Sequence, residues 1–209
     1  MSTQRPSIRP SAKPGPGDSG AHATHDPKVK GVAFRSVLAC LEQLRGAAFV
    51  EASMGRLAAD QAHMLRYTIV QTGWYPIALY RALWAAIVSE TPGDYELVRA
   101  IGGATIRRDV GGVYRVLFKV LSIETLITLS SKLFPYYYDT GRLSNERVSA
   151  NCIRSTYEGC IGFDRIMWEE LAGSSSELIE MAGGYDVKVT ISRGGQDLST
   201  MCVIQIDWH

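Results

Sequence analysis

The four cysteines have the widest chemical range of any side chains in this sequence, because a thiolate can bind a metal ion or take part in redox reactions. They are Cys40, Cys152, Cys160 and Cys202, and no two form a Cys-x-x-Cys pair. The N-terminus lacks the apolar stretch of a secretory signal, so we expect a reducing compartment and no disulfides. We interpret the cysteines as small core residues. The alternative is a metal or redox sensor built on Cys152, Cys160 and Cys202, which all fall in or beside a predicted sheet.

Histidine, the usual acid–base catalyst, is scarce in the body of the chain, where only His63 and the terminal His209 occur. His63 has no serine motif beside it, and no His-x-x-x-His pair is present. The glycine pairs at 102–103 and 111–112 lack the Lys-Ser/Thr of a phosphate-binding loop. Glu169 and Glu170 are adjacent on a predicted helix, and we interpret them as a diverging, solvated pair. The sequence therefore predicts a protein that is not an enzyme and has no catalytic residues.

An aromatic run over residues 133–138 supplies candidate ligand contacts. We predict that this segment is extended, which would place Phe134, Tyr136 and Tyr138 on one face of a strand. Two interpretations are open. The rings pack a helical layer onto a sheet, or they line a pocket between the two layers with their hydroxyls as its few polar groups. Tyr80 and Trp84, on a predicted helix, complete the candidate pocket residues.

The helix predicted over residues 75–89 is apolar on nearly every side. Such a helix is buried either within a domain or between chains. We therefore expect a homodimer whose interface includes Tyr80, Leu83, Trp84 and Ile87. A second apolar stripe predicts a long helix over residues 113–129. A ligand pocket, if present, lies between these two helices and the sheet.

The C-terminal residues alternate with the two-residue period of β-strands, on either side of a Gly194-Gly195 turn. A helix predicted over residues 163–172 precedes this hairpin. The chain thus reads as helices, then strands, then one late helix and a hairpin. This order predicts an α+β fold, with an N-terminal helical layer packed on a small antiparallel sheet of about four strands. The inward-facing residues of the predicted hairpin are Val187, Val189, Ile191, Cys202, Ile204, Ile206 and Trp208.

Composition divides the chain into a tail and one domain. Residues 1–28 hold five of the eight prolines and few apolar residues, so we predict a disordered tail before a single domain at residues 29–209. The formal net charge is +1, which gives no strong field to attract nucleic acid. The longest charge-free apolar run, residues 82–88, is far shorter than the ~20 residues of a membrane span. We expect a cytoplasmic protein with no membrane span and no nucleic-acid partner.

Three elements carry a family resemblance: Gly73-Trp74-Tyr75-Pro76 before a helix, Tyr137-Tyr138-Asp139-Thr140-Gly141 before a strand, and a terminal hairpin that ends in Trp208. Over residues 30–208 the sequence resembles a myxobacterial family of paralogous proteins. More distantly, the layout is similar to a superfamily that includes haem-nitric-oxide/oxygen-binding domains, 4-vinyl-reductase-like domains and vesicle-tethering subunits. That resemblance implies a helical layer over a four-stranded antiparallel sheet. It also implies dimerisation in several members and, in several, a small molecule or acyl chain between the layers.

The haem-binding members of that superfamily use a helix histidine and a Tyr-x-Ser-x-Arg element. Residues 136–142 here read Tyr-Tyr-Tyr-Asp-Thr-Gly-Arg, and His63 precedes the stretch where the resemblance places the ligand. We therefore predict no cofactor. The leading hypothesis is a non-enzymatic regulatory, signalling or scaffolding module that binds a small apolar ligand or a protein partner. The alternative is a purely structural interaction protein with a filled core.

Overall fold

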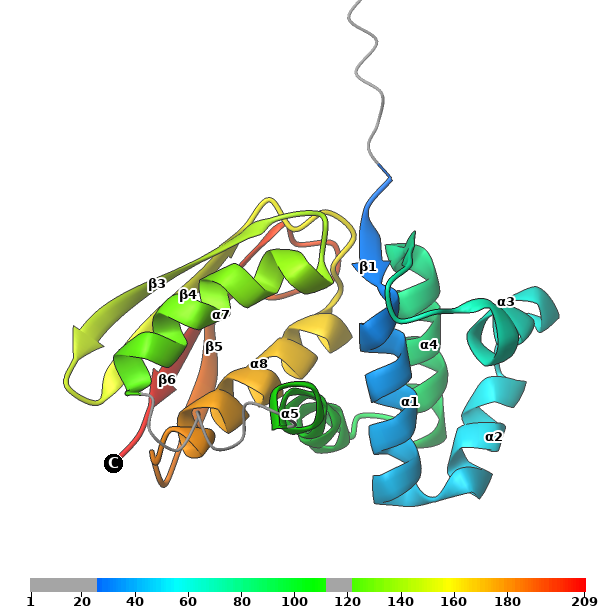
Figure 1. The fold of residues 1–209 in the computed structure, drawn as a ribbon, viewed down its shortest axis with the longest axis horizontal. Helices are drawn as coiled ribbons and strands as arrows, with labels where there is room; N and C mark the ends of the chain where they lie inside the picture. Colours follow the sequence, from blue (N-terminus) through cyan, green and yellow to red (C-terminus); the bar gives the residue numbers. More distant parts are fainter. Residues whose placement is uncertain (1–25, 112–121) are drawn as a thin grey trace, which may run out of the picture.

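The computed structural model describes residues 26–111 and 122–209, and it confirms the predicted α+β fold. A four-stranded sheet lies at one end of the molecule and most of the N-terminal helices lie at the other (Figure 1). The strands β3 (Arg142–Ser149), β4 (Cys152–Glu158), β5 (Lys188–Gly194) and β6 (Met201–Asp207) run in the order β3-β4-β6-β5, with every neighbour antiparallel. The predicted tail at residues 1–28 lies almost entirely outside the described residues.

The inner face of the sheet follows from the two-residue period of its strands. Tyr157 pairs with Cys202 across β4 and β6, and Ile153 pairs with Ile206, so these side chains share one face and are buried. Trp208 is buried on the same side of the terminal strand, as the alternation predicted. The C-terminal hairpin is confirmed, although its turn is longer than the Gly194-Gly195 dipeptide, because β6 begins only at Met201.

The helices α7 (Ile123–Tyr137) and α8 (Arg165–Met181) cover this inner face, α7 over β3 and α8 over β5 and β6 (Figure 1). The prediction of an extended segment at 133–138 is wrong for residues 133–137, because they form the last turns of α7; only Tyr138, which follows the helix, has an extended backbone. The aromatic run has the composition of a strand, but a helix that starts after Ser122 continues through it, with Pro135 inside. Ser122 Oγ accepts a hydrogen bond from the backbone N–H of Thr125 and caps this helix.

The helix predicted over residues 113–129 is not one continuous element in the described part of the chain. Ser122 has an extended backbone, so α7 begins there as a separate helix. The remainder of the predicted helix, up to residue 121, lies outside the described residues.

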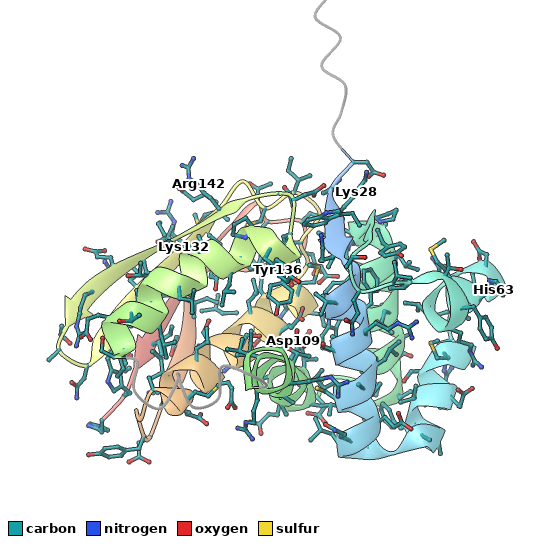
Figure 2. All side chains as sticks on the ribbon, in the orientation of Figure 1. Lys28, His63, Asp109, Lys132, Tyr136 and Arg142 are labelled. Atoms are coloured by element: carbon teal, nitrogen blue, oxygen red, sulfur yellow. The ribbon has the colours of Figure 1, made fainter. Side chains whose placement is uncertain are left out.

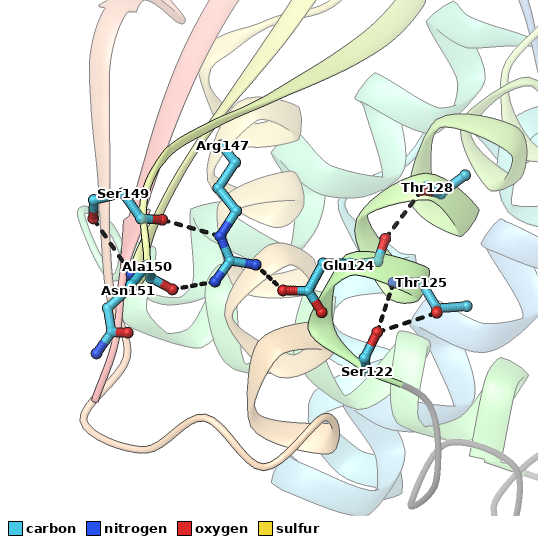
Figure 3. Close-up of polar contacts among 8 residues, drawn as sticks. All are labelled: Ser122, Glu124, Thr125, Thr128, Arg147, Ser149, Ala150 and Asn151. Atoms are coloured by element: carbon cyan, nitrogen blue, oxygen red, sulfur yellow. Dashed lines mark hydrogen bonds and ion pairs between the residues drawn. The ribbon is translucent and has the colours of Figure 1, made fainter.

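A cluster of polar contacts ties the start of α7 to the β3–β4 hairpin (Figure 3). The Arg147 guanidinium forms an ion pair with Glu124 on α7 and donates to the backbone carbonyls of Ser149 and Ala150. Arg147 therefore connects the first turn of α7 with the turn that joins two strands of the sheet. This contact orients α7 along the sheet.

The N-terminal part consists of α-helices, a π-helical turn and a two-stranded antiparallel pair formed by β1 and β2. The Trp-Tyr-Pro motif is β2 itself, and Val29 of β1 pairs with Tyr75. Within residues 26–111 and 122–209, no helix has both the length and the apolar character needed to cross a membrane. The elements in chain order are β1 (Lys28–Lys30), α1 (Gly31–Arg45), α2 (Ala47–Gly55), α3 (Ala59–His63), η1 (Met64–Thr68), β2 (Trp74–Pro76), α4 (Ile77–Glu90) and α5 (Tyr95–Gly111).

The apolar helix α4 is an interior helix of the chain. The side chains of Tyr80, Leu83, Trp84 and Ile87 are all 0% exposed. They are covered by the chain itself, since α4 packs against α2 and α8. The predicted dimer interface through these four residues is therefore wrong, because none of them reaches the surface. Dimerisation through another surface stays a prediction.

Helices α5 and α8 join the helical part to the sheet through a very close crossing. A Cβ atom added to Gly102 would lie 2.2 Å from the backbone oxygen of Glu170, and one added to Gly173 would lie 2.0 Å from that of Arg99. Only glycine allows this approach. Arg99 pairs with Glu169 beside the crossing, and Arg107 pairs with Glu177 about two turns further along. The crossing determines which side of α8 faces the sheet and which faces α5.

Candidate functional site

A cavity of about 90 Å³ lies between α5, α7, α8 and the inner face of the sheet. Its position between the layers agrees with the predicted pocket, but α4 contributes none of its described lining residues. The expected location against residues 75–89 is therefore wrong, because α5 and α8 stand between α4 and the sheet. The walls are mainly apolar, and the main apolar contributors are Leu126, Leu133, Phe134, Leu171, Leu178, Ile153 and Ile206.

The first acidic group on the wall is Asp109, in the last turn of α5 (Figure 2). Its carboxylate accepts hydrogen bonds from Ser36 Oγ of α1 at 2.5 Å and from the Tyr137 hydroxyl of α7 at 3.0 Å. Burial raises the pKa of Asp109, and these two hydrogen bonds partly oppose that rise. Burial and the neighbouring Asp109 carboxylate together raise the pKa of Tyr137. Asp109 therefore links three helices at one end of the cavity.

The second acidic group is Glu170 of α8, which is 5% exposed and also lines the cavity. Its Oε1 accepts a hydrogen bond of 2.5 Å from the hydroxyl of Tyr80, whereas its Oε2 is buried without a hydrogen-bond partner among the described residues. Burial raises the pKa of Glu170 to about 8. The indole N–H of Trp84 lies close enough to lower this pKa but does not meet the geometry of a hydrogen bond.

Most of the remaining polar side chains on the wall form hydrogen bonds within the protein. Asn145 of β3 donates to the backbone oxygen of Ile127 and to Ser130 Oγ, at 2.8 and 2.9 Å, and accepts from Ser155 Oγ at 2.7 Å. These bonds connect the sheet to α7 across the cavity. The hydroxyls of Ser174 and Ser175 donate to backbone oxygens of α5 and α8. Besides Glu170, whose Oε2 has no hydrogen-bond partner among the described residues, Tyr138 and Tyr157 bring hydroxyl groups to the described wall.

The predicted pocket residues are only partly brought together. Phe134 of α7 and Tyr138, the residue that follows this helix, are both buried and line the cavity, with ring centroids 5.1 Å apart. Tyr136 does not join them, because a helix turns it outward. It is 53% exposed, with the ammonium of Lys30 5.8 Å from its ring centroid. Tyr80 and Trp84 lie behind the wall and contact the cavity only through Glu170.

Reasoning from sequence missed Asp109 and misassigned Glu170. Both Glu169 and Glu170 are buried, so the interpretation as a solvated pair is wrong. Glu169 is covered because it pairs with Arg99 of α5, while Glu170 points into the core. A signal was available: Ile166 and Met167, four and three residues before Glu170, share its side of the helix and place that carboxyl beside apolar side chains.

The cysteines are all buried free thiols. Cys152 pairs with Asp207 at one end of β4, whereas Cys160 follows the other end of that strand, where its N–H donates to Thr200. Cys202 pairs with Tyr157 and is therefore near Cys160 rather than Cys152. Burial raises the pKa of Cys160 and of Cys202 to about 12, which favours the unreactive thiol. Within the described residues, no three of His, Cys, Asp and Glu are placed to hold a metal ion.

The two histidines of the body of the chain are remote from the cavity. His63 ends α3 at the far side of the helical part (Figure 2), with its ring 5.1 Å from that of Tyr67. His209 exchanges backbone hydrogen bonds with Tyr185.

Solved structures of H-NOX proteins are similar to this chain. An oxygen-binding H-NOX domain related to soluble guanylate cyclases superposes with a TM-score of 0.64, at 15% identity over 86% of this chain and 94% of that one. The Fe(II) unliganded H-NOX protein from K. algicida gives 0.63, at 15% identity over 86% and 96%. A structure that probes haem distortion in the H-NOX family gives 0.65, at 14% identity over 86% and 94%.

The chain has an H-NOX-like fold. This confirms the resemblance to the haem-nitric-oxide-binding superfamily at the level of fold. No protein-family model matches the sequence, and no curated protein matches it. The resemblances to the myxobacterial paralogues, to 4-vinyl-reductase-like domains and to vesicle-tethering subunits stay predictions.

The residues described around the cavity do not fit haem. A single benzene ring occupies an apolar cavity of about 150 Å³, so a porphyrin does not enter a space of about 90 Å³. No histidine, cysteine or methionine is among the described lining residues, and the sequence has no histidine between His63 and His209. Histidine, thiolate and thioether are common axial ligands of haem iron. The tyrosines on the wall have raised pKa values, which disfavour the tyrosinate form.

Proposed function

We propose that this chain is a non-enzymatic regulatory or scaffolding module that binds a small, largely apolar ligand between its helical layer and its sheet. The cavity of about 90 Å³ among α5, α7, α8 and the inner sheet face carries this proposal. Binding sites of this kind are mostly apolar, with a few placed polar groups that orient the ligand. Asp109 and Glu170 are such groups, and Phe134 and Tyr138 supply apolar wall.

Two further observations support binding without catalysis. Besides the carboxyl groups of Asp109 and Glu170 and several hydroxyls, the described lining residues include no histidine, lysine, arginine or cysteine, which are the common partners in a nucleophile–base pair. The serine hydroxyls of α8 donate to backbone oxygens rather than to a side-chain base. A ligand in the cavity would contact α5, α7, α8 and the sheet at once, and it could therefore change how the two parts of the molecule pack. That coupling suits a regulatory domain.

The size of the cavity limits the ligand. If benzene occupies about 150 Å³, a space of about 90 Å³ holds about four non-hydrogen atoms. We therefore expect diatomic gases, xenon or very small organic molecules to enter without rearrangement. A larger ligand requires α7 to move from the sheet, against the hydrogen bonds of Asn145 and the Arg147–Glu124 ion pair.

Xenon binding followed by ¹²⁹Xe NMR tests the proposal, since xenon enters apolar cavities without hydrogen bonds. We expect a concentration-dependent xenon shift with the wild-type protein. The Ala33→Leu variant should lose it, because Ala33 lines the cavity and three added carbons fill it. Ala47→Leu is the matched control, as Ala47 is exposed on α2. No xenon binding, or equal binding by Ala33→Leu, would favour the alternative of a structural protein with a filled core.

A further inference from the structure

The charges on the cavity wall are of one sign. Its described lining residues include the carboxyl groups of Asp109 and Glu170 and no lysine, arginine or histidine. Other acids of the same helix pair do have partners: Glu169 pairs with Arg99 and Glu177 with Arg107, both on the side of α8 that faces α5. Within the described residues, neither cavity acid forms such an ion pair. A buried acid without a cation is costly, and a cationic ligand would remove that cost.

The two acids differ in how many of their carboxylate oxygens accept a hydrogen bond from the protein. Asp109 accepts from Ser36 and from Tyr137, so its oxygens are engaged by α1 and α7. Glu170 accepts from Tyr80 on one oxygen, and its Oε2 has no hydrogen-bond partner among the described residues, with the Trp84 indole N–H close to the carboxyl but outside hydrogen-bond geometry. This oxygen belongs to a side chain that is 5% exposed and lines the cavity. It is the acceptor that a hydrogen-bond donor on a ligand would reach.

The rings beside these acids also suit a cation. Phe134, Tyr138 and Tyr157 line the cavity. Tyr157 lies on β4, with its ring centroid 5.4 Å from that of Phe134 on α7. Aromatic faces attract an ammonium group through the ring quadrupole, while their carbon atoms contact an alkyl chain. The cavity thus combines an unpaired acid with an aromatic wall, a combination used to bind alkylammonium ions.

The geometry points to a small aliphatic amine, bound as its ammonium ion, as the ligand class of this cavity, with Glu170 Oε2 accepting its N–H and the aromatic wall covering its carbons. This inference rests on the proposed ligand-binding function. An amine of about four non-hydrogen atoms matches the available volume. A neutral gas or alcohol would leave Glu170 Oε2 without an ionic partner, and a carboxylate ligand would be repelled by both acids.

Binding of an ammonium ion requires Glu170 to ionise, so its affinity depends on pH. The titratable groups that act on Glu170 are Tyr80 on α4, Tyr137 at the end of α7, Tyr138 just after it, and Asp164 at the start of α8. None of them is a cation, and burial raises the pKa of Glu170 to about 8. The ionised fraction of such a group rises about tenfold between about pH 7 and pH 9, while an alkylamine with a pKa of about 10.4 stays protonated. Affinity should rise by the same factor.

The test compares n-propylammonium chloride, 1-propanol and sodium propionate as ligands of the full chain, by NMR titration at about pH 8.5, with sodium chloride as the ionic-strength control. We expect propylammonium to bind at least tenfold more tightly than either analogue, and its affinity to rise about tenfold from pH 7 to pH 9. Glu170→Gln should remove both the preference and the pH dependence while xenon still binds.

The possible failures are distinct. If xenon binds but 1-propanol or propionate binds as tightly as propylammonium, the amine inference is wrong and the proposed function stands. If neither xenon nor any of the three compounds binds, the proposed function itself is wrong. Should Glu170→Gln fail to fold, the pH dependence in the wild type decides: an affinity that does not change between pH 7 and pH 9 would overturn the role of Glu170.

Discussion

Replacing Glu170 by glutamine should change how the stability of this protein depends on pH. Glutamine has nearly the shape of a protonated glutamic acid but cannot ionise. Burial raises the pKa of Glu170 from 4.5 to about 8 in the folded protein. Because the folded-state value is the higher one, the protonated carboxyl contributes stability fully below about pH 4.5, and this contribution is lost as the pH rises through about 8. The Glu170→Gln variant has no ionisable group at this position, so its stability does not fall in this way as the pH rises.

The magnitude follows from the shift. Each pH unit between the two pKa values is equivalent to about 1.4 kcal/mol. The free energy of unfolding of the wild type should therefore fall, relative to Glu170→Gln, by on the order of 4 kcal/mol between about pH 5 and pH 8.5. This is a large part of the roughly 5–15 kcal/mol by which a folded domain is stable. Both proteins share every other titratable group, including Asp109. Subtracting one free energy of unfolding from the other therefore removes the contribution of those groups.

Urea denaturation at half-unit pH steps measures this difference. Glu96→Gln serves as the control, since Glu96 is exposed on the first turn of α5 and should give a pH profile parallel to that of the wild type. A constant difference between wild type and Glu170→Gln across the range would refute the reasoning. It would mean that Glu170 stays ionised when buried and has a cationic partner or more hydrogen bonds than the structure gives it.

Three further predictions concern packing. Trp84→Ala should lower the free energy of unfolding by about 3–5 kcal/mol in urea denaturation, because Trp84 is fully buried within the chain. A folded, monomeric variant that loses little stability would instead support Trp84 as an interface residue. Asn145→Ala removes two hydrogen bonds from the sheet to α7 and one from Ser155 within the sheet, so it should cost about 1–3 kcal/mol and speed amide hydrogen exchange in α7; unchanged exchange would show that the two bonds to α7 do not hold the helix. Gly173→Ala should destabilise by about 1–3 kcal/mol, since its Cβ meets the backbone of Arg99. Gly55→Ala, where an added Cβ meets nothing within 4 Å, should be close to neutral, and equal effects of the two would contradict the close crossing.

Local patterns in the sequence were sufficient where the determining interactions are themselves local. The alternation through Cys202, Ile204, Ile206 and Trp208 predicted a strand and its inward face correctly, because a strand presents every second side chain to the same side. The apolar character of residues 75–89 predicted a buried helix for a similar reason. The α+β order of elements follows from the change of period along the chain.

Tertiary structure decided the points at which local preference and packing conflict. Residues 133–138 have the composition of a strand, yet residues 133–137 continue α7, which is capped at Ser122 and held by Asn145 from β3. Because this segment is helical, Tyr136 faces solvent and Phe134 is buried. Whether α4 is covered by its own chain or by a second copy depends on how α2 and α8 pack, which no local pattern contains.

The candidate site depends on tertiary structure most of all. Asp109, Glu170 and Phe134 come from three helices and meet only because Gly102 and Gly173 let α5 and α8 cross closely beside the sheet. The sequence determined that Glu170 lies on an apolar helix face. The tertiary structure decided that Glu170 lies on the cavity wall and that its Oε2 has no hydrogen-bond partner among the described residues. It also buried the carboxyl, which raises its pKa.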